Sequence, residues 1–468
     1  MNVSPPSQKL IVRVLRMAAE GEAVAKAEGS PRVVFVAGGA PGDLCEVEVV
    51  AAKSSFARAR LLRLIEPGPE RIDPACPLHA APGRPGPACG GCDWQHLRYD
   101  AQLKHKTSLI RDCLERIAKL KDIPVLEALA SPKPWAYRNK VQVPFGPPPP
   151  GSKRPSAGFY AAGSHRIVDF EACPVQPELS VRLACRVKDL AAEFDWPVYD
   201  PASGRGWLRH LFVRTNAQGQ AAAALVTRTP DLPKAEPFIS RMRAEFPQLV
   251  GLHQNVQPEK TSVILGPRWK CLWGSRAIEE KLGRFCFQAS PGAFLQVNTE
   301  AAVLLYDAAL AALSEGSPRW STLLDLYCGV GTLALWLSGA AQKVVGIEEN
   351  PDAVRDAWKN AERNRVRNAR FRAGRAESLL PRLAKDGLAA PCAAVVDPPR
   401  AGLTVPVLRF LTGTAIRRVV YVSCNPATFA RDAAYLCRSG YKLLRVQPVD
   451  LFPQTSHVEL VGLLDRGS

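Results

Sequence analysis

The chain has 468 residues, enough for about two to four domains of ordinary size. Its composition, 47% hydrophobic and 22% charged, excludes a disordered or collagen-like chain, and its net charge of +17 favours a polyanionic partner such as nucleic acid. No run approaches the roughly 18 apolar residues of a membrane span and no signal peptide is recognised, so we expect a cytoplasmic protein without membrane contacts.

The N-terminal residues 1–66 contain β-rich runs at Ile11–Leu15, Val33–Val36, Glu46–Val50 and Phe56–Leu64, separated by Gly and Pro. This pattern predicts a small, OB-like β-barrel. The stretches G-E-A-V-A and V-F-V-A-G-G-A-P-G-D resemble a TRAM domain, and that resemblance implies RNA binding. An unrelated small barrel is the alternative, because fold alone does not establish function.

Residues 67–290 mix short strands and helices, which predicts a central α+β domain. One helix is expected over residues 99–121, where apolar side chains recur at helical spacing and form one side, namely Leu103, Ile110, Leu114 and Ile117.

Residues 291–468 alternate between strand and helix, which predicts an α/β domain with a doubly wound, mostly parallel sheet. The last two strands have no helix between them, so we expect them to form an antiparallel edge hairpin. The expected strands are Thr322–Tyr327, Lys343–Glu348, Arg370–Arg372, Ala393–Asp397, Arg417–Ser423, Leu443–Val449 and Val458–Leu464.

A glycine loop comes directly after the first of these strands. Gly329 and Gly331 stand between the strand and the next helix, where they let a ligand approach the backbone. The loop lacks the third glycine typical of a dinucleotide site. Glu348 ends the next strand, and an acid at that place accepts hydrogen bonds from ribose hydroxyls. The pattern favours a nucleotide-type cofactor without a pyrophosphate, such as S-adenosylmethionine.

The sequence S-C-N-P after the fifth strand makes Cys424 a candidate nucleophile. Asn425 and Pro426 are residue types typical of a helix start, and a thiol at a helix N-terminus is favoured as thiolate. Glu459, in the run H-V-E, is the candidate base, and His457 is either an orienting group or a core histidine.

These segments resemble the RNA uracil-5-methyltransferases, through D-L-Y-C-G-V-G, D-P-P-R-A-G, V-S-C-N-P-A-T-F-A-R-D and D-L-F-P-Q-T-S-H-V-E, together with F-L-Q-V-N and Y-R-N-K. The resemblance implies cofactor contacts from Gln296, Tyr327, Gly329, Gly331, Glu348 and Asp397. It also implies substrate contacts from Arg138, Gln296 and Asp397.

The chemistry needs the same kinds of groups. Uracil C5 is a poor nucleophile until a thiolate adds to C6, and a base must later remove the C5 proton. Cys424, Glu459 and Asp397 supply a nucleophile, a base and a polar contact.

Four cysteines form a second group: Cys76, Cys89, Cys92 and Cys173. A zinc site is the general interpretation of C-x-x-C. The C-G-G-C-x-W-Q-H context instead resembles the iron–sulfur branch of the family, which implies a [4Fe–4S] cluster held by these thiols. The gap between Cys76 and Cys89 is longer than is usual in that branch.

The expected activity is therefore methylation of uridine in RNA by a monomeric enzyme, with 23S ribosomal RNA as the favoured substrate and tRNA as the alternative. A cytosine-5 RNA methyltransferase is disfavoured, because the run from Asp397 to Arg400 contains no second cysteine. A non-catalytic RNA-binding protein is disfavoured by the presence of Cys424 and Glu459.

Overall fold

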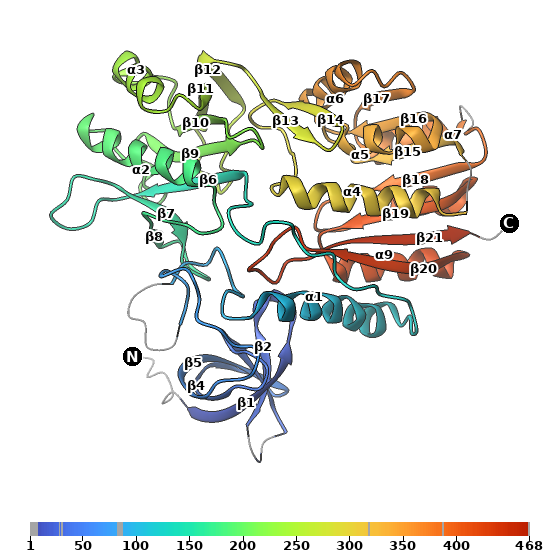
Figure 1. Cartoon of the computed structure of the whole chain (residues 1–468), viewed down its shortest axis with the longest axis horizontal. Coiled ribbons are helices and arrows are strands. Elements are labelled where there is room, and N and C mark those ends of the chain that lie inside the picture. Colours follow the sequence, from blue (N-terminus) through green and yellow to red (C-terminus); the bar gives the residue numbers. More distant parts are fainter. Residues whose placement is uncertain are drawn as a thin grey trace.

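The computed structural model describes residues 8–27, 29, 31–81, 88–316, 319–385 and 388–466. Figure 1 shows a small barrel at the N-terminal end, a central sheet with helices, and a second sheet flanked by helices at the C-terminal end. Two parts of the sequence predictions lie outside the described residues, namely positions 1–7 of the barrel unit and 82–87 of the gap before Cys89. In the described ranges, no helix is long and apolar enough to cross a membrane.

The barrel closes in the strand order β1-β2-β3-β5-β4. Side chains alternate along β1, with Val12 and Val14 buried inside and Ile11 and Leu15 exposed. Trp94, from the segment after the cysteine pair, is fully buried in the same core and joins the barrel to the central part of the chain. The strands are β1 (Lys9–Met17), β2 (Ala23–Ala27), β3 (Val33–Ala37), β4 (Leu44–Ala52) and β5 (Phe56–Glu66).

The central sheet has the order β12-β11-β10-β9-β6-β7-β8, and two helices cover its apolar side. Its strands are β6 (Lys140–Gly146), β7 (Ser156–Tyr160), β8 (Ile167–Asp169), β9 (Leu208–Thr215), β10 (Ala221–Thr227), β11 (Leu249–Val256) and β12 (Arg268–Gly274). The helices are α2 (Glu178–Glu193) and α3 (Ala235–Glu245). A hairpin of β13 (Ile278–Leu282) and β14 (Phe285–Ala289) comes next and packs into the core of the C-terminal region.

The C-terminal sheet has the order β17-β16-β15-β18-β19-β21-β20, with the first five strands parallel and β21 antiparallel to β19 and β20. This confirms the predicted sheet and edge hairpin. Its strands are β15 (Trp320–Leu326), β16 (Ala341–Glu348), β17 (Ala369–Ala373), β18 (Cys392–Val396), β19 (Ile416–Ser423), β20 (Tyr441–Val449) and β21 (Glu459–Arg466).

Helices cover both faces of this sheet. One face packs against α4 (Thr299–Ser314), α5 (Thr332–Trp336) and α6 (Pro351–Arg363). The other packs against α7 (Ala376–Lys385), α8 (Val405–Gly413) and α9 (Pro426–Arg438), and also against α1 (Tyr99–Cys113) from the central part of the chain.

The predicted helix at residues 99–121 is only partly correct. The α-helix α1 continues into a single π-helical turn, Leu114–Ala118. The wider turn rotates the last side chains, so Ile117 is exposed while Ala118 is buried. Ile117 therefore does not belong to the predicted apolar side.

Candidate active site

The glycine loop after β15 leaves open space beside Gly329 and is closely packed beside Gly331. Tyr327, Gly329 and Gly331 all have positive φ angles, of 71°, 54° and 85°. A Cβ atom on Gly331 would lie 3.1 Å from the ring of Phe371, whereas no atom lies within 4 Å of a Cβ placed on Gly329. The Gly329 N–H donates to Glu348 Oε2 at 3.0 Å, so the acid at the end of β16 lies beside the loop.

The Y-R-N-K and F-L-Q-V-N segments are joined by hydrogen bonds. The Asn139 side-chain amide donates to Gln296 O at 3.1 Å, and its main-chain N–H donates to Val297 O at 2.8 Å. Arg138 and Asn298 form an antiparallel bridge. The Gln296 side chain is buried. The hydrogen bond from Asn139 holds the backbone of Gln296 beside the start of β6.

Cys424 and Glu459 occupy neighbouring positions on adjacent strands. Ser423, the last residue of β19, pairs with Leu460 of β21, so Cys424 and Glu459 lie at the next rung of the antiparallel ladder. Asp397 lies just after β18, which flanks β19 on its other side. The three predicted groups therefore meet at one rim of the sheet.

Burial controls the ionisation of these groups. It raises the pKa of Cys424 to about 11, with further increases from the charges of Glu459 and Asp397 and a decrease from Arg400. Burial raises the pKa of Asp397 to about 7 and raises that of Glu459 well above its ordinary value. Asn425 does cap α9, but the expected preference for the thiolate is outweighed by burial and by two neighbouring acids.

A cavity of about 330 Å³ lies next to Cys424, and its walls come from distant parts of the chain. Sequence reasoning missed the turn of the barrel at Ala19 and Glu20 and the α1 residues Leu109 and Cys113. No motif marks them, because they reach the cavity only through the packing of the barrel and α1 onto the C-terminal region. The remaining walls are Arg400, Cys424, Asn425, Pro426, Ala427, Ser456, His457 and Val458.

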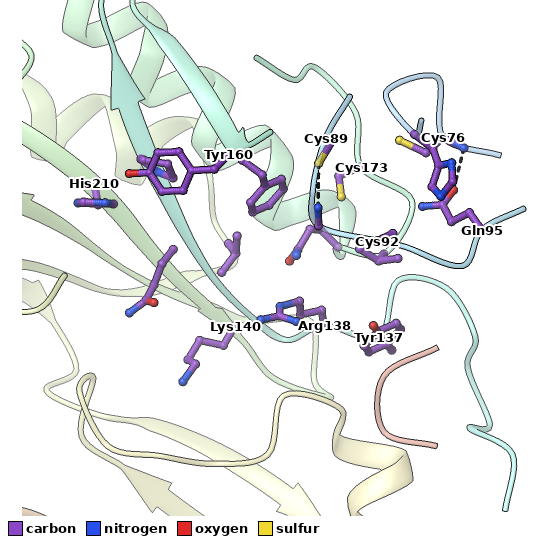
Figure 2. Close-up of a pocket in the computed structure, with 18 of the residues that line it drawn as sticks. Cys76, Cys89, Cys92, Gln95, Tyr137, Arg138, Lys140, Tyr160, Cys173 and His210 are labelled. Carbon is purple, nitrogen blue, oxygen red and sulfur yellow. Dashed lines mark hydrogen bonds between the residues drawn. The ribbon is translucent and has the colours of Figure 1, made fainter. Parts of the chain in front are cut away.

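The four predicted ligand cysteines line a separate cavity of about 270 Å³ (Figure 2). Burial raises the pKa of Cys92 to about 12, and a hydrogen bond with Gln95 opposes this shift. Across the described residues, no three His, Cys, Asp or Glu side chains are arranged to hold a single metal ion. Arg138 lines this cavity, not the cavity beside Cys424.

The chain is similar along its whole length to RNA methyltransferases. The family described as tRNA (Uracil-5-)-methyltransferase matches residues 275–467. A protein of Bacillus cereus named as an RNA methyltransferase is 40% identical, over 96% of this chain and 94% of its own. The chain belongs to the RNA uracil-5-methyltransferase family. Another relative, an RNA methyltransferase of Gloeobacter violaceus, is 39% identical over 98% of this chain and 97% of its own.

A solved structure extends the similarity to the other two regions. The tRNA (uracil-54, C5)-methyltransferase of Pyrococcus abyssi, in complex with S-adenosyl-L-homocysteine, matches with a TM-score of 0.74 and 27% identity. The match covers 98% of this chain and 100% of that chain. The barrel and the central sheet are therefore part of an architecture found in the RNA uracil-5-methyltransferase family.

Proposed function

We propose that this member of the RNA uracil-5-methyltransferase family transfers a methyl group from S-adenosylmethionine to uridine C5 through a covalent Cys424 adduct. The observation that carries the proposal is the position of Cys424, directly after β19, beside Glu459 at the start of β21, with Asp397 directly after the neighbouring strand β18. This arrangement provides the nucleophile, the base and the polar contact that the reaction requires.

The reaction begins when the Cys424 thiolate adds to C6, and the electron pair of the C5–C6 double bond makes C5 a nucleophile. C5 attacks the sulfonium methyl group and releases S-adenosylhomocysteine. Glu459 then removes the C5 proton, and the electron pair re-forms the double bond while the thiolate leaves C6. Arg400 lowers the pKa of both Cys424 and Glu459, so it favours the charged form that each needs.

The open glycine loop beside Glu348 fits a nucleoside cofactor, because the acid can accept hydrogen bonds from ribose hydroxyls. The proposed cofactor contacts are Gln296, Tyr327, Gly329, Gly331, Glu348 and Asp397. For the uridine and its flanking nucleotides, the proposed contacts are Arg138, Gln296 and Asp397.

The proposed substrate is a uridine of 23S ribosomal RNA, on the resemblance of the barrel and cysteine motifs to that branch of the family. Transfer RNA is the second candidate, and the full-length similarity to the Pyrococcus abyssi protein favours it. In both cases we propose a monomer that acts in the cytoplasm.

We also propose that Cys76, Cys89, Cys92 and Cys173 hold a [4Fe–4S] cluster. The donor set fits, because all four thiols line one cavity. The ligands of a four-iron cluster stand at separate iron corners, so they need not converge on one ion as zinc ligands do. Protein purified without oxygen should contain about four irons and four sulfides per chain, whereas stoichiometric zinc would reject the cluster.

The three regions have separate proposed roles. Residues 1–66 bind RNA, residues 67–290 hold the cysteines and contact the substrate, and residues 291–468 bind the cofactor and carry out methyl transfer. The β13–β14 hairpin links the last two, because it packs on the C-terminal core.

RNA containing 5-fluorouridine tests the function directly. Fluorine replaces the proton that Glu459 would remove, so the methylated adduct cannot break down and a detergent-resistant protein–RNA complex should form. The complex should require S-adenosylmethionine and Cys424. Mapping 5-methyluridine in ribosomal and transfer RNA from cells with and without the protein then identifies the substrate. The proposal would be overturned if neither RNA lost 5-methyluridine in cells without the protein and no protein–RNA complex formed with 5-fluorouridine.

A further inference from the structure

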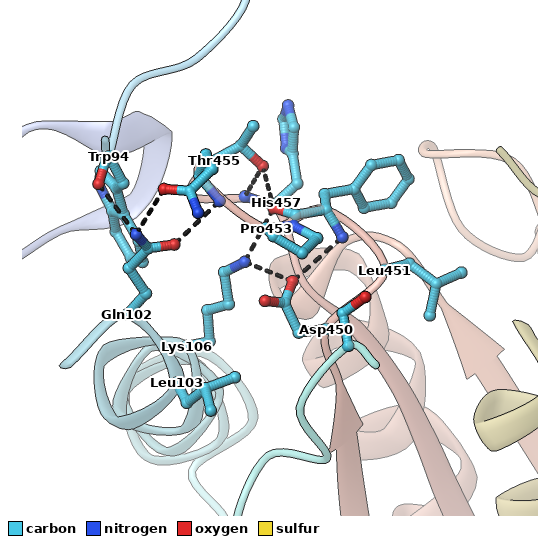
Figure 3. A network of polar contacts seen from close by, with 12 residues as sticks. Trp94, Gln102, Leu103, Lys106, Asp450, Leu451, Pro453, Thr455 and His457 are labelled. Atoms are coloured by element: carbon cyan, nitrogen blue, oxygen red, sulfur yellow. Dashed lines mark hydrogen bonds and ion pairs between the residues drawn. The ribbon is translucent and has the colours of Figure 1, made fainter. Parts of the chain in front are cut away.

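The loop between β20 and β21, residues 450–458, brings His457 to the Cys424 cavity and leads directly into Glu459. Polar contacts from distant segments fix its first half (Figure 3). Lys106 of α1, fully buried, donates to Asp450 Oδ1 at 2.6 Å and to Phe452 O at 3.0 Å. Gln102 lies one turn before Lys106 on α1. It exchanges two hydrogen bonds, of 2.9 and 3.0 Å, with Gln454 of the loop.

Asp93 holds the second half of this loop. Ser456 donates its main-chain N–H to Asp93 Oδ1 at 2.8 Å and its hydroxyl to Asp93 Oδ2 at 2.6 Å. Ser456 immediately precedes His457, and Asp93 is the residue directly after Cys92, which lines the cysteine cavity. One pair of hydrogen bonds therefore connects the walls of the two cavities.

The barrel packs against the same carboxylate. A Cβ atom on Gly21, whose φ is 82°, would lie 2.1 Å from Asp93 Oδ2. Trp94 also donates its indole N–H to Gly21 O at 3.2 Å. Since Ala19 and Glu20 of this turn line the Cys424 cavity, Gly21 lets the barrel come close enough to form that wall.

We propose that Asp93 is a positioning residue that couples the Cys92 side of the cysteine cavity, and the barrel turn, to the loop that carries His457 and Glu459. Only the kinetic part of this inference rests on the proposed function. A shift of the backbone at Cys92 moves Asp93, and Ser456 moves with it through two charge-assisted hydrogen bonds. A misplacement of about 1 Å can cost on the order of 100-fold in rate, so a small movement at Cys92 alters methyl transfer.

The first test separates positioning from folding. Asp93→Ala should lower kcat on RNA by about 10- to 100-fold, while the affinity for S-adenosylmethionine stays unchanged. Asp93→Asn keeps an acceptor for the Ser456 N–H and should recover most of the lost rate. Ser456→Ala should cost less, and combining it with Asp93→Ala should add little further loss, because both remove one interaction.

Asp100→Ala is the matched control. Asp100 is an exposed acid seven residues further along the chain, and it pairs with Arg98 and Lys104, both outside the loop. It should leave kcat unchanged. If Asp93→Asn lost as much rate and as much thermal stability as Asp93→Ala, the role of Asp93 would be purely structural and the proposal would be overturned.

Hydrogen exchange tests the coupling without any RNA. The Ser456 amide should exchange faster in Asp93→Ala, and also in the full-length Cys92→Ser variant, but not in Asp100→Ala. Unchanged exchange at Ser456 in Asp93→Ala would overturn the positioning role. Unchanged exchange in Cys92→Ser would overturn the coupling to the cysteine cavity. Because this readout needs no substrate, its failure is distinguishable from failure of the proposed function.

Discussion

In the proposed mechanism Glu459 acts as a base, at a position where burial favours its neutral form. Its exposed fraction is 4%. Burial and the charge of Asp397 raise its pKa, and Arg400 lowers it. A carboxylate with a raised pKa is the stronger base once it is ionised, which suits the removal of a carbon-bound proton.

Replacing this base should stop the reaction after methyl transfer. In Glu459→Gln the Cys424 thiolate can still add and C5 can still accept the methyl group, but the C5 proton stays. A methylated protein–RNA adduct should therefore accumulate and resist detergent, and turnover should fall by about 100- to 10,000-fold. Mass measurement of the adduct checks this. Cys424→Ala is the control and should form no adduct; normal turnover in Glu459→Gln would remove Glu459 from the mechanism.

The same electrostatics predict the pH dependence. Glu459 must be ionised to act and its pKa is raised, so kcat should increase with pH below that pKa. Asp397→Asn removes a charge that raises the Glu459 pKa, so the midpoint of the profile should move to lower pH. Arg400→Gln removes a cation that lowers the Glu459 pKa, so the midpoint of the profile should move to higher pH. Measured profiles that shift in the same direction in both variants would contradict this assignment.

At the scale of elements, periodicity and glycine patterns predicted the C-terminal sheet well. The strand predicted at Arg417–Ser423 is observed at Ile416–Ser423. The two agree because a short apolar run between two helical stretches is typical of a buried strand. The strand Ala23–Ala27 was not among the predicted strands, since its small side chains give a weak β signal. The end of α1 was also missed, because no residue pattern marks a π-turn.

The candidate site was predictable where its chemistry lies in local motifs, as at Cys424 and Glu459. Its supports were not predictable, because each is a contact between segments far apart in the chain. Lys106 and Asp450 are separated by 344 positions, and both side chains are fully buried. A buried lysine within an amphipathic helix has the same sequence signature as an exposed one.

This ion pair gives a stability prediction for α1 and the loop. Lys106→Met should lower the free energy of unfolding by about 3–5 kcal/mol, because Asp450 becomes an unpaired buried charge. Adding Asp450→Asn should recover most of that loss, since neither charge is then buried. Denaturant unfolding measures both. Lys104→Met, at an exposed neighbour that pairs with Asp100, should change stability by less than about 1 kcal/mol; an equal loss there would contradict the role of the buried pair.

At the scale of the whole molecule, the barrel turn at Ala19 and Glu20 forms part of the wall of the Cys424 cavity. An RNA whose uridine occupies that cavity must therefore pass beside the barrel. Arg58, Arg60 and Arg63 of β5 are about half or more exposed, with side-chain exposures of 49%, 68% and 66%. Each pairs with a barrel glutamate, but such surface pairs contribute little and can be exchanged for RNA phosphates.

Replacing these three arginines by glutamine should weaken RNA binding, because phosphate contacts release counterions. The slope of log affinity against log salt should become shallower by about 0.7–0.9 for each phosphate that the protein no longer neutralises, with unchanged affinity for S-adenosylmethionine. Titrations at several salt concentrations measure both quantities. The matched control removes three exposed cations on or beside α3, namely Lys234, Arg241 and Arg243, at the far end of the molecule from the barrel (Figure 1). An equal change of slope in both triple variants would show that only net charge matters and would refute a docking role for the barrel.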